Sequence, residues 1–314
     1  MFINSISHYT PDTVISNQFF EENFGISDND IFSKSGIRQR RKTKDNENTN
    51  SMAIEAVKNA YFDLPYPITD IDLIIGATYT PYDTVGTLAH TIQRQFDIHK
   101  AKCFTVDSAC SSFVNAVEIV DCFFYKNKAK NALIIVSENN TVYNDFSDNK
   151  SGFLWGDGAS AIFISNEKCS DDDFEILDVN TSALGNVGKG IDGVCLKPLT
   201  GIKMPYGKDV FQNACTYMIN ETIEILEKNK IPLHNLNYFI PHQANARIID
   251  YVTKSLNLNP SIVLSNIEFF GNTGSASTPI VLSQNKDLFK SNDIIVISVF
   301  GGGYSSGALL LKKL

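Results

Sequence analysis

The chain has 314 residues, of which 43% are hydrophobic and 20% are charged, so it can bury one large core or two medium-sized ones. Its formal net charge of -8 argues against nucleic-acid binding, which is typical of basic domains. No apolar run is long enough to cross a bilayer, and the first residues lack the basic and apolar regions of a secretory signal. We therefore expect a cytoplasmic protein that neither enters a membrane nor binds nucleic acid.

Strand and helix patterns alternate through the first half of the chain. In order, we expect a strand at 2–6, helices at 17–24 and 49–62, a strand at 72–79, a helix at 87–96, a strand at 103–106, a helix at 113–124, and strands at 131–138 and 161–164. This alternation predicts an α/β half with a largely parallel sheet. The basic residues at 38–44 are interpreted as a solvated loop, and docking of an anion there stays open.

The acidic stretch at 170–173 marks an expected boundary between two halves, residues 1–168 and 169–314. The second half repeats the pattern, with expected helices at 210–228 and 244–256 and strands at 238–241 and 293–299. We interpret the chain as a duplicated α/β unit whose two halves pack as one body.

The six cysteines show neither the paired spacing of a zinc site nor a disulfide framework. They are Cys103, Cys110, Cys122, Cys169, Cys195 and Cys215. This usage fits a reducing compartment, and nothing in the sequence calls for a metal or another cofactor.

Cys110 follows the apolar strand pattern at 103–106 and precedes the apolar helix pattern at 113–124. A thiol at the start of a helix feels unpaired amide groups and the positive end of the dipole, which predicts a lowered pKa and a reactive thiolate. The alternative, a small buried apolar residue, is open on this evidence alone.

Three later motifs decide between these interpretations of Cys110. His242 lies between a strand and a helix, at the strand end where α/β sheets collect ligands. Asn272 lies in a turn of small residues that leaves its amide free to donate. Three glycines at 301–303 end the last long strand and can aim amide N–H groups at an oxyanion.

Together these motifs resemble the thiolase-fold ketosynthases, specifically the type III β-ketoacyl-acyl-carrier-protein synthases, over essentially the whole chain. The resemblance rests on SGIRQR at 35–40, DSAC at 107–110, WGDGA at 155–159, PHQANAR at 241–247, GNT at 271–273 and FGGGY at 300–304. Degradative thiolases are disfavoured, because they use a second cysteine late in the chain and none follows Cys215.

The resemblance implies a five-layered αβαβα fold, a homodimer and a ketosynthase (acyltransferase) activity. Cys110 would accept the acyl group, and His242 and Asn272 would hold the carbonyl of a second thioester. The backbone amides of Cys110 and Gly302 would form the oxyanion hole. Acyl carrier protein and acyl thioesters are the implied partners. An acyl-cysteine is activated towards carbon nucleophiles, and two neutral donors stabilise the enolate formed beside it.

The sequence differs from the family at the positions with which the housekeeping enzyme binds the adenine of coenzyme A. Asp30 and Asn149 stand at the aromatic and arginine positions of that clamp, and Lys34 replaces a second arginine. Of the basic set only Arg247 remains, and we expect it and the nearby Asn245 to contact substrate. Acyl groups are therefore expected to arrive on a carrier protein, unless CoA binds differently.

Val85 stands where the family loop crosses the dimer interface and closes the partner's acyl pocket. A bulky aromatic there restricts the family to short primers, so the smaller Val85 implies longer acyl chains. The amino-acid sequences of several segments most resemble those of the ketosynthases of dialkylresorcinol and flexirubin-type biosynthesis, which form a cyclohexanedione ring. The alternative is the housekeeping synthase that starts fatty-acid synthesis from acetyl-CoA and malonyl carrier protein.

Overall fold

The computed structural model describes all residues, 1–314. Its strands are β1 (Phe2–Tyr9), β2 (Thr13–Ser16), β3 (Gln39–Lys42), β4 (Leu73–Ala77), β5 (Lys102–Val106), β6 (Asn131–Glu138), β7 (Gly158–Ser165), β8 (Phe174–Ala183), β9 (Cys195–Lys197), β10 (Gly201–Lys203), β11 (Tyr238–Pro241), β12 (Ile294–Gly301) and β13 (Ser305–Lys313). Its α-helices are α1 (Asn17–Phe24), α2 (Asp28–Ser35), α3 (Thr49–Tyr61), α4 (Leu88–Gln95), α5 (Ser112–Tyr125), α6 (Gly207–Lys228), α7 (Ala246–Ser255), α8 (Ile267–Phe270) and α9 (Ser277–Gln284).

Nine strands form one mixed sheet in the order β11-β12-β13-β8-β1-β7-β6-β4-β5. The contact between β1 and β8 is short, because only Phe2 and Ile3 pair with Glu175 and Phe174. The sheet therefore consists of two parts, one built from β1 and β4–β7 and the other from β8 and β11–β13. In the first part β4 is parallel to β5 and β6, whereas β7 runs antiparallel to β6 and β1. The prediction of a largely parallel first half was right only for those three strands.

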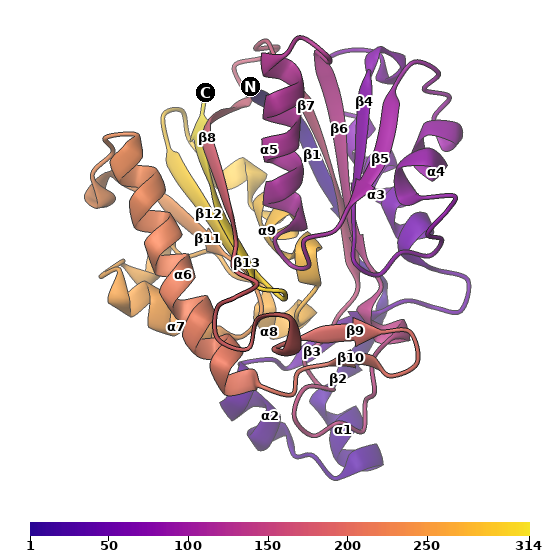
Figure 1. Cartoon of the computed structure of the whole chain (residues 1–314), viewed down its shortest axis with the longest axis vertical. Helices are drawn as coiled ribbons and strands as arrows, with labels where there is room; N and C mark the ends of the chain where they lie inside the picture. Colours follow the sequence, from indigo (N-terminus) through magenta and orange to yellow (C-terminus); the bar gives the residue numbers. More distant parts are fainter.

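Five layers follow from how the helices pack against the two parts of the sheet (Figure 1). Helices α3 and α4 cover the outer face of the first part, and α6 and α7 cover the outer face of the second. Helices α5 and α9 contribute to a central core that contains inward-facing residues of both parts. Helix α5 is almost wholly apolar on its buried side because it is covered by strands from both halves. The predicted αβαβα layering is confirmed.

Most long elements lie where the hydrophobic pattern predicts them, but most of a small layer below the sheet was missed. Besides the predicted α1, this layer contains α2 and the antiparallel pair β2 and β3, and it includes the basic residues at 38–44. Arg40 is fully buried and donates to the carbonyl oxygens of Ile15 and Phe153 and to Asn17 Oδ1. Burial lowers the pKa of its guanidinium to about 9. The interpretation of this segment as a solvated loop was wrong for Arg40, which ties three segments together.

The hairpin of β9 and β10 was also not predicted, and it lies across the end of the sheet where the long strands finish (Figure 1). The last strand, β13, completes the second part of the sheet by pairing with both β12 and β8. None of the helices combines the length and the hydropathy that crossing a membrane requires.

Candidate active site

Cys110 lies on a tight elbow between β5 and α5. The residue before it, Ala109, has a φ of 50°, in the left-handed region that residues other than glycine seldom occupy. Such a conformation costs on the order of 1 to 3 kcal/mol and persists only where the surroundings determine it. Here Ala109 N–H donates to Asp107 Oδ1 at 2.8 Å, and Ser112 Oγ donates to Ala109 O at 2.7 Å.

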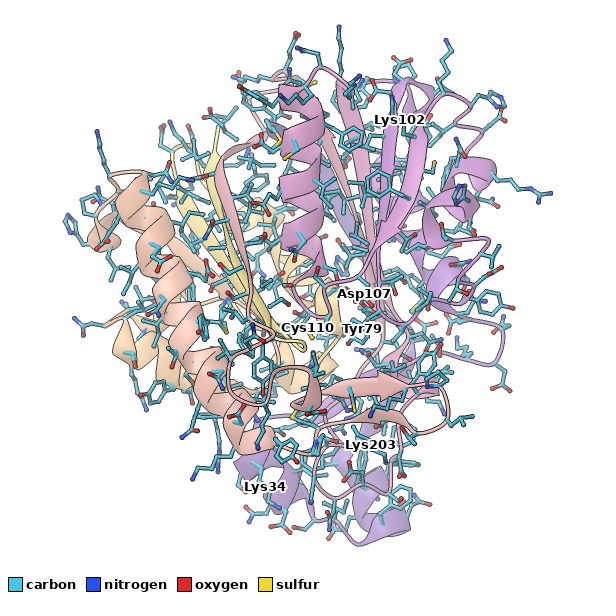
Figure 2. All side chains as sticks on the ribbon, in the orientation of Figure 1. Lys34, Tyr79, Lys102, Asp107, Cys110 and Lys203 are labelled. Carbon is cyan, nitrogen blue, oxygen red and sulfur yellow. The ribbon has the colours of Figure 1, made fainter.

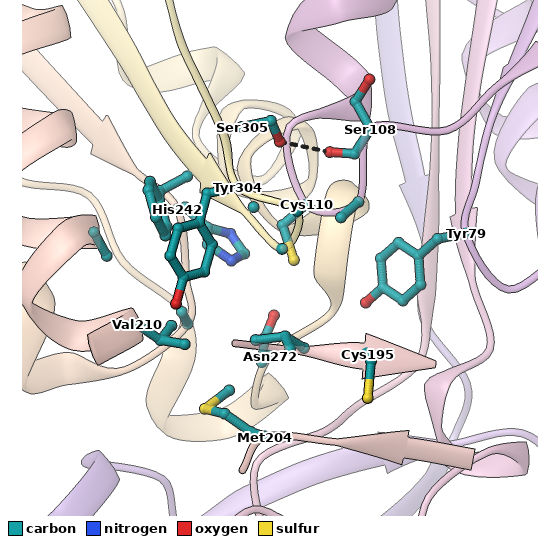
Figure 3. Close-up of a pocket in the computed structure, with 18 of the residues that line it drawn as sticks. Tyr79, Ser108, Cys110, Cys195, Met204, Val210, His242, Asn272, Tyr304 and Ser305 are labelled. Atoms are coloured by element: carbon teal, nitrogen blue, oxygen red, sulfur yellow. Dashed lines mark hydrogen bonds between the residues drawn. The ribbon is translucent and has the colours of Figure 1, made fainter. Parts of the chain in front are cut away.

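Serine side chains fasten this elbow to the second half of the molecule. Ser305, at the start of β13, donates to Ser108 O at 3.0 Å (Figure 3), and its hydroxyl lies 2.7 Å from the Ser111 hydroxyl. The hydrogen bonds of these serines hold the elbow against the glycine-rich segment between β12 and β13.

The elbow opens into a cavity of about 540 Å³ that both halves of the chain line. Cys110, His242 and Asn272 all lie on its wall, together with Gly302 and Tyr304. Figure 3 shows the Cys110 sulfur beside the imidazole of His242, with Asn272 below it and Tyr79 on the other side. The three residues that the sequence predicts as catalytic are therefore brought together at one cavity. Residues of the β9 and β10 hairpin close its far side, which the sequence did not predict.

His242 directly follows β11 and is almost fully buried, with its backbone N–H bonded to Ser298 O at 2.8 Å. Its Nδ1 lies 2.8 Å from the Ser277 hydroxyl, and its Nε2 has no partner in the protein. Burial lowers the pKa of His242 to about 4, so the imidazole is neutral near pH 7. When the Ser277 hydroxyl donates to Nδ1, Nε2 carries the proton and can donate it into the cavity.

Asn272 is oriented by its own turn. Gly274 N–H donates to Asn272 Oδ1 at 2.9 Å, and the backbone N–H of Asn272 donates to Leu154 O at 2.8 Å. Its side-chain nitrogen donates to no protein group. The site thus presents two neutral donors, Asn272 Nδ2 and His242 Nε2, to a ligand oxygen. Two such donors stabilise an enolate without introducing a charge of their own.

The amides proposed as an oxyanion hole also face the cysteine. The Gly302 N–H points at the Cys110 sulfur and lowers the pKa of the thiol, and the Cys110 N–H has no backbone acceptor. At Gly301, an added Cβ would lie 2.9 Å from Cys110 N, so a side chain there would crowd the second donor. The glycine run after β12 is consistent with close approach of backbone to a bound thioester.

The thiol itself is less acidic than the sequence suggested. Burial and the negative charge of Glu138 raise the pKa of Cys110 to about 12, and the hydrogen bond from the Gly302 N–H only partly opposes this. The expected lowering by the helix terminus was therefore wrong. Loss of hydration in the cavity outweighs a terminal dipole effect, which is worth about 0.3 to 1 kcal/mol. The resting site holds a neutral thiol beside a neutral imidazole.

This raised pKa makes a prediction for alkylation. Since only the thiolate attacks iodoacetamide, modification of Cys110 should accelerate about tenfold per pH unit from about pH 7 to pH 10 without levelling off. Peptide mass spectrometry would separate Cys110 from the exposed Cys122 and Cys169. A plateau beginning below about pH 9 would show instead that the thiol titrates near its ordinary value.

Two residues beside Cys110 were missed by sequence reasoning. Tyr79 follows β4 and lines the cavity, and Glu138 is fully buried at the end of β6. The Glu138 carboxyl accepts hydrogen bonds from Tyr79 N–H and from the hydroxyls of Thr80 and Ser275. Burial raises the pKa of Glu138 to about 8. The sequence did contain one signal for Glu138, because it is a charged residue at the end of an otherwise apolar strand. A buried carboxyl at such a position needs several hydrogen-bond partners.

The remaining predicted substrate contacts do not line the cavity of this chain. Val85 is 86% exposed on the loop after β4. Asn245 caps α7, accepting from Arg247 N–H at 2.9 Å, and its amide nitrogen donates to Lys34 O at 3.0 Å. Arg247 is exposed at the start of that helix. Asn245 therefore has a structural role that the sequence-based assignment overlooked. No group of three or more metal-binding side chains is placed to hold an ion.

Models of one protein family match segments in both halves of the chain. The model of the family described as 3-Oxoacyl-[acyl-carrier-protein (ACP)] synthase III matches residues 104–185, and that of its C-terminal domain matches residues 226–313. The beta-ketoacyl-[acyl-carrier-protein] synthase III of Clostridium perfringens is 35% identical, over 97% of this chain and 96% of its own. The protein of the same name from Campylobacter jejuni is 32% identical, over 99% and 97%.

A solved structure is similar over the same span. The crystal structure of 3-oxoacyl-[acyl-carrier-protein] synthase III from Aquifex aeolicus superimposes with a TM-score of 0.92 at 33% identity, covering 99% of each chain. The likeness therefore includes the missed elements as well as the predicted ones.

Proposed function

Because the chain belongs to the 3-oxoacyl-[acyl-carrier-protein] synthase III family and is an acyltransferase of the ketosynthase class, we propose that it forms a carbon-carbon bond between two acyl thioesters. The observation that carries the proposal is the convergence of Cys110, His242 and Asn272 on one cavity that also holds the Gly302 amide. Each of these groups has a role in one of two successive half-reactions.

In the first half-reaction Cys110 attacks the carbonyl of an acyl thioester. The carbonyl oxygen becomes negative and is stabilised by the N–H groups of Cys110 and Gly302. The donor's thiol leaves with the proton that the Cys110 thiol gives up, and the acyl group stays on the sulfur. Since the pKa of the resting thiol is about 12, this proton has to leave as the donor binds rather than before.

In the second half-reaction a malonyl thioester places its carbonyl oxygen between His242 Nε2 and Asn272 Nδ2. Loss of CO₂ leaves an enolate whose negative oxygen those two donors stabilise. The enolate carbon attacks the acyl carbonyl on Cys110, the bond from sulfur to carbon breaks, and the thiolate takes up a proton. The product is a 3-oxoacyl thioester.

The comparisons favour the reaction that starts fatty-acid synthesis over the ring-forming reaction that the resemblance of several sequence segments suggested. The relatives described above carry the name of the synthase and cover nearly the whole chain. We therefore propose decarboxylative condensation with a malonyl carrier protein as the activity. Ring closure, as in dialkylresorcinol biosynthesis, is the second candidate, and a diffusible cyclohexanedione product would identify it.

The donor of the first acyl group is proposed to be a carrier protein. Asp30 and Asn149, at the positions of the family's adenine clamp, are exposed and offer no aromatic face. Lys34 and Lys203 lie on the same side of the molecule, below Cys110 (Figure 2). Lys34 is exposed, whereas Lys203 is half-buried and paired with Asp145 Oδ2 at 2.9 Å. The exposed charge of Lys34 favours docking of an acidic carrier by charge complementarity.

Reconstitution with malonyl carrier protein tests both points. We expect a 3-oxoacyl carrier product by mass spectrometry, and about tenfold or more lower efficiency with an acyl-CoA than with the same acyl chain on carrier protein, since an aromatic stack is worth about 1 to 3 kcal/mol. Unchanged malonyl carrier in every mixture would refute the function. Equal efficiency of the two donors would refute only the preference for a carrier.

Chain-length selection is proposed to depend on Val85 of a second subunit. A homodimer in which the loop after β4 reaches the neighbouring cavity would place an isopropyl group where an aromatic ring closes the pocket of relatives. Val85→Phe should then shift preference from medium to short acyl groups by on the order of a hundredfold, since it would exclude roughly three or four methylenes that each contribute about 0.8 kcal/mol when buried. Competition between short and medium acyl thioesters would measure this, and an unchanged ratio of acyl-enzyme masses would remove Val85 from the pocket.

A further inference from the structure

The hydroxyl of Tyr79 is a polar group beside the nucleophile to which the proposed mechanism assigns no role. Tyr79 lines the cavity, and Figure 3 shows its hydroxyl pointing into it from the side opposite His242. Its hydroxyl faces the same cavity as the Cys110 thiol, and it donates to Asn140 Oδ1 at 2.7 Å. The acyl group carried by Cys110 must pass close to this oxygen.

Asn140 determines which way the Tyr79 proton points. The amide nitrogen of Asn140 donates to Gly156 O at 2.8 Å and to Asn272 O at 3.3 Å, and both acceptors are backbone carbonyls. Since carbonyls cannot donate, the nitrogen of the Asn140 amide has to face them and its oxygen has to face Tyr79. The phenol proton is therefore committed to Asn140, and the hydroxyl offers only lone pairs to the cavity.

The ring cannot easily turn away from this position. Gly274 lies against it, because a Cβ at that position would be 2.2 Å from Tyr79 Oη, and the φ of Gly274 is +59°. A side chain at 274 would displace the ring as well as strain the turn. The same turn holds Asn272, so the orientation of Tyr79 and that of a catalytic donor are determined together.

We propose that Tyr79 is a specificity-determining residue that selects acyl groups with a hydroxyl close to the thioester, as in a 3-hydroxyacyl group. In the free enzyme the Cys110 S–H can donate to Tyr79 Oη, and acylation removes that donor. The hydroxyl of a 3-hydroxyacyl group replaces that donor by donating to Tyr79 Oη. A methylene group at the same position leaves the lone pair of Tyr79 Oη without a partner, and the oxygen of a 3-oxo group places a second acceptor opposite it. This selection rests on the proposed acyl-enzyme and specifies its substrate class.

Competition for Cys110 tests the proposal. Wild type is incubated with equal amounts of 3-hydroxybutyryl, butyryl and 3-oxobutyryl thioesters, and the acyl-enzymes are counted by intact-protein mass spectrometry. The 3-hydroxybutyryl adduct should exceed each of the others, and Tyr79→Phe should reduce that excess about fivefold, the effect of one net hydrogen bond. Tyr125→Phe, at the exposed end of α5 and outside the cavity lining, is the matched control and should leave the ratio as in wild type.

An excess that is absent in wild type, or unchanged in Tyr79→Phe, would overturn the selection. Either result is distinct from failure of the proposed function, in which no thioester forms an adduct or no condensation product appears.

Discussion

Replacing Cys110 by alanine is expected to abolish both acyl-enzyme formation and condensation. The sulfur is the only atom removed, and it is the atom on which the acyl group would be held. Because the side chain faces a cavity, its loss leaves little new empty space in the core, so the protein should remain folded. Intact-protein mass spectrometry after incubation with an acyl thioester should show a single adduct on wild type and none on Cys110→Ala.

The control for this experiment lies in the same cavity. Cys195 also lines it, and a thiol there is a possible second acceptor. Peptide mapping of the wild-type adduct should place the acyl group on Cys110 and leave Cys195 unmodified. An adduct of equal yield on folded Cys110→Ala, checked by circular dichroism, would refute the nucleophile.

His242→Ala is expected to separate the two half-reactions. The imidazole is neutral and in the proposed mechanism donates to the second thioester, so its loss should lower the condensation rate on the order of 100- to 1,000-fold. Acylation should remain measurable, since the oxyanion formed in that step is held by backbone amides. Single-turnover acylation and steady-state condensation, measured on the same preparation, provide the comparison.

Ser277→Ala is the matched variant, because Ser277 contacts Nδ1 of His242 and not the cavity. It should reduce condensation less than His242→Ala, since the imidazole is still present but less well oriented. If His242→Ala lowered acylation and condensation equally, the imidazole would be acting mainly as a base for Cys110.

Much of the fold could be predicted because the long buried elements have simple patterns. β6 and α1 lie at the predicted residues, and α3, α5 and β11 agree within about one residue. Helix α2 was missed because its sequence, DNDIFSKS, is mostly polar and its apolar contacts come from other segments. The hairpin of β9 and β10 was missed because its strands have only three residues each.

The meeting of Cys110, His242 and Asn272 at one cavity was predictable because each lies at a strand end or a small-residue turn. The groups that tune these residues were not, since they depend on tertiary contacts. Glu138 affects Cys110 only because β6 and the elbow end at the same place. Likewise, no local pattern shows that Tyr79 packs on Gly274, or that Asn140 orients it. The pKa of Cys110 was mispredicted for the same reason, because burial is a property of the folded cavity.

The central claim is that an acyl group on Cys110 is the electrophile in carbon-carbon bond formation, and a chase experiment tests it most directly. Wild type is loaded with an acyl thioester, freed of donor and mixed with malonyl carrier protein, and the masses of enzyme and carrier are followed together. We predict that the acyl mass leaves the enzyme as the carrier loses CO₂ and gains that acyl group. An acyl-enzyme that persists, or that releases only free acid while malonyl carrier stays unchanged, would contradict the account.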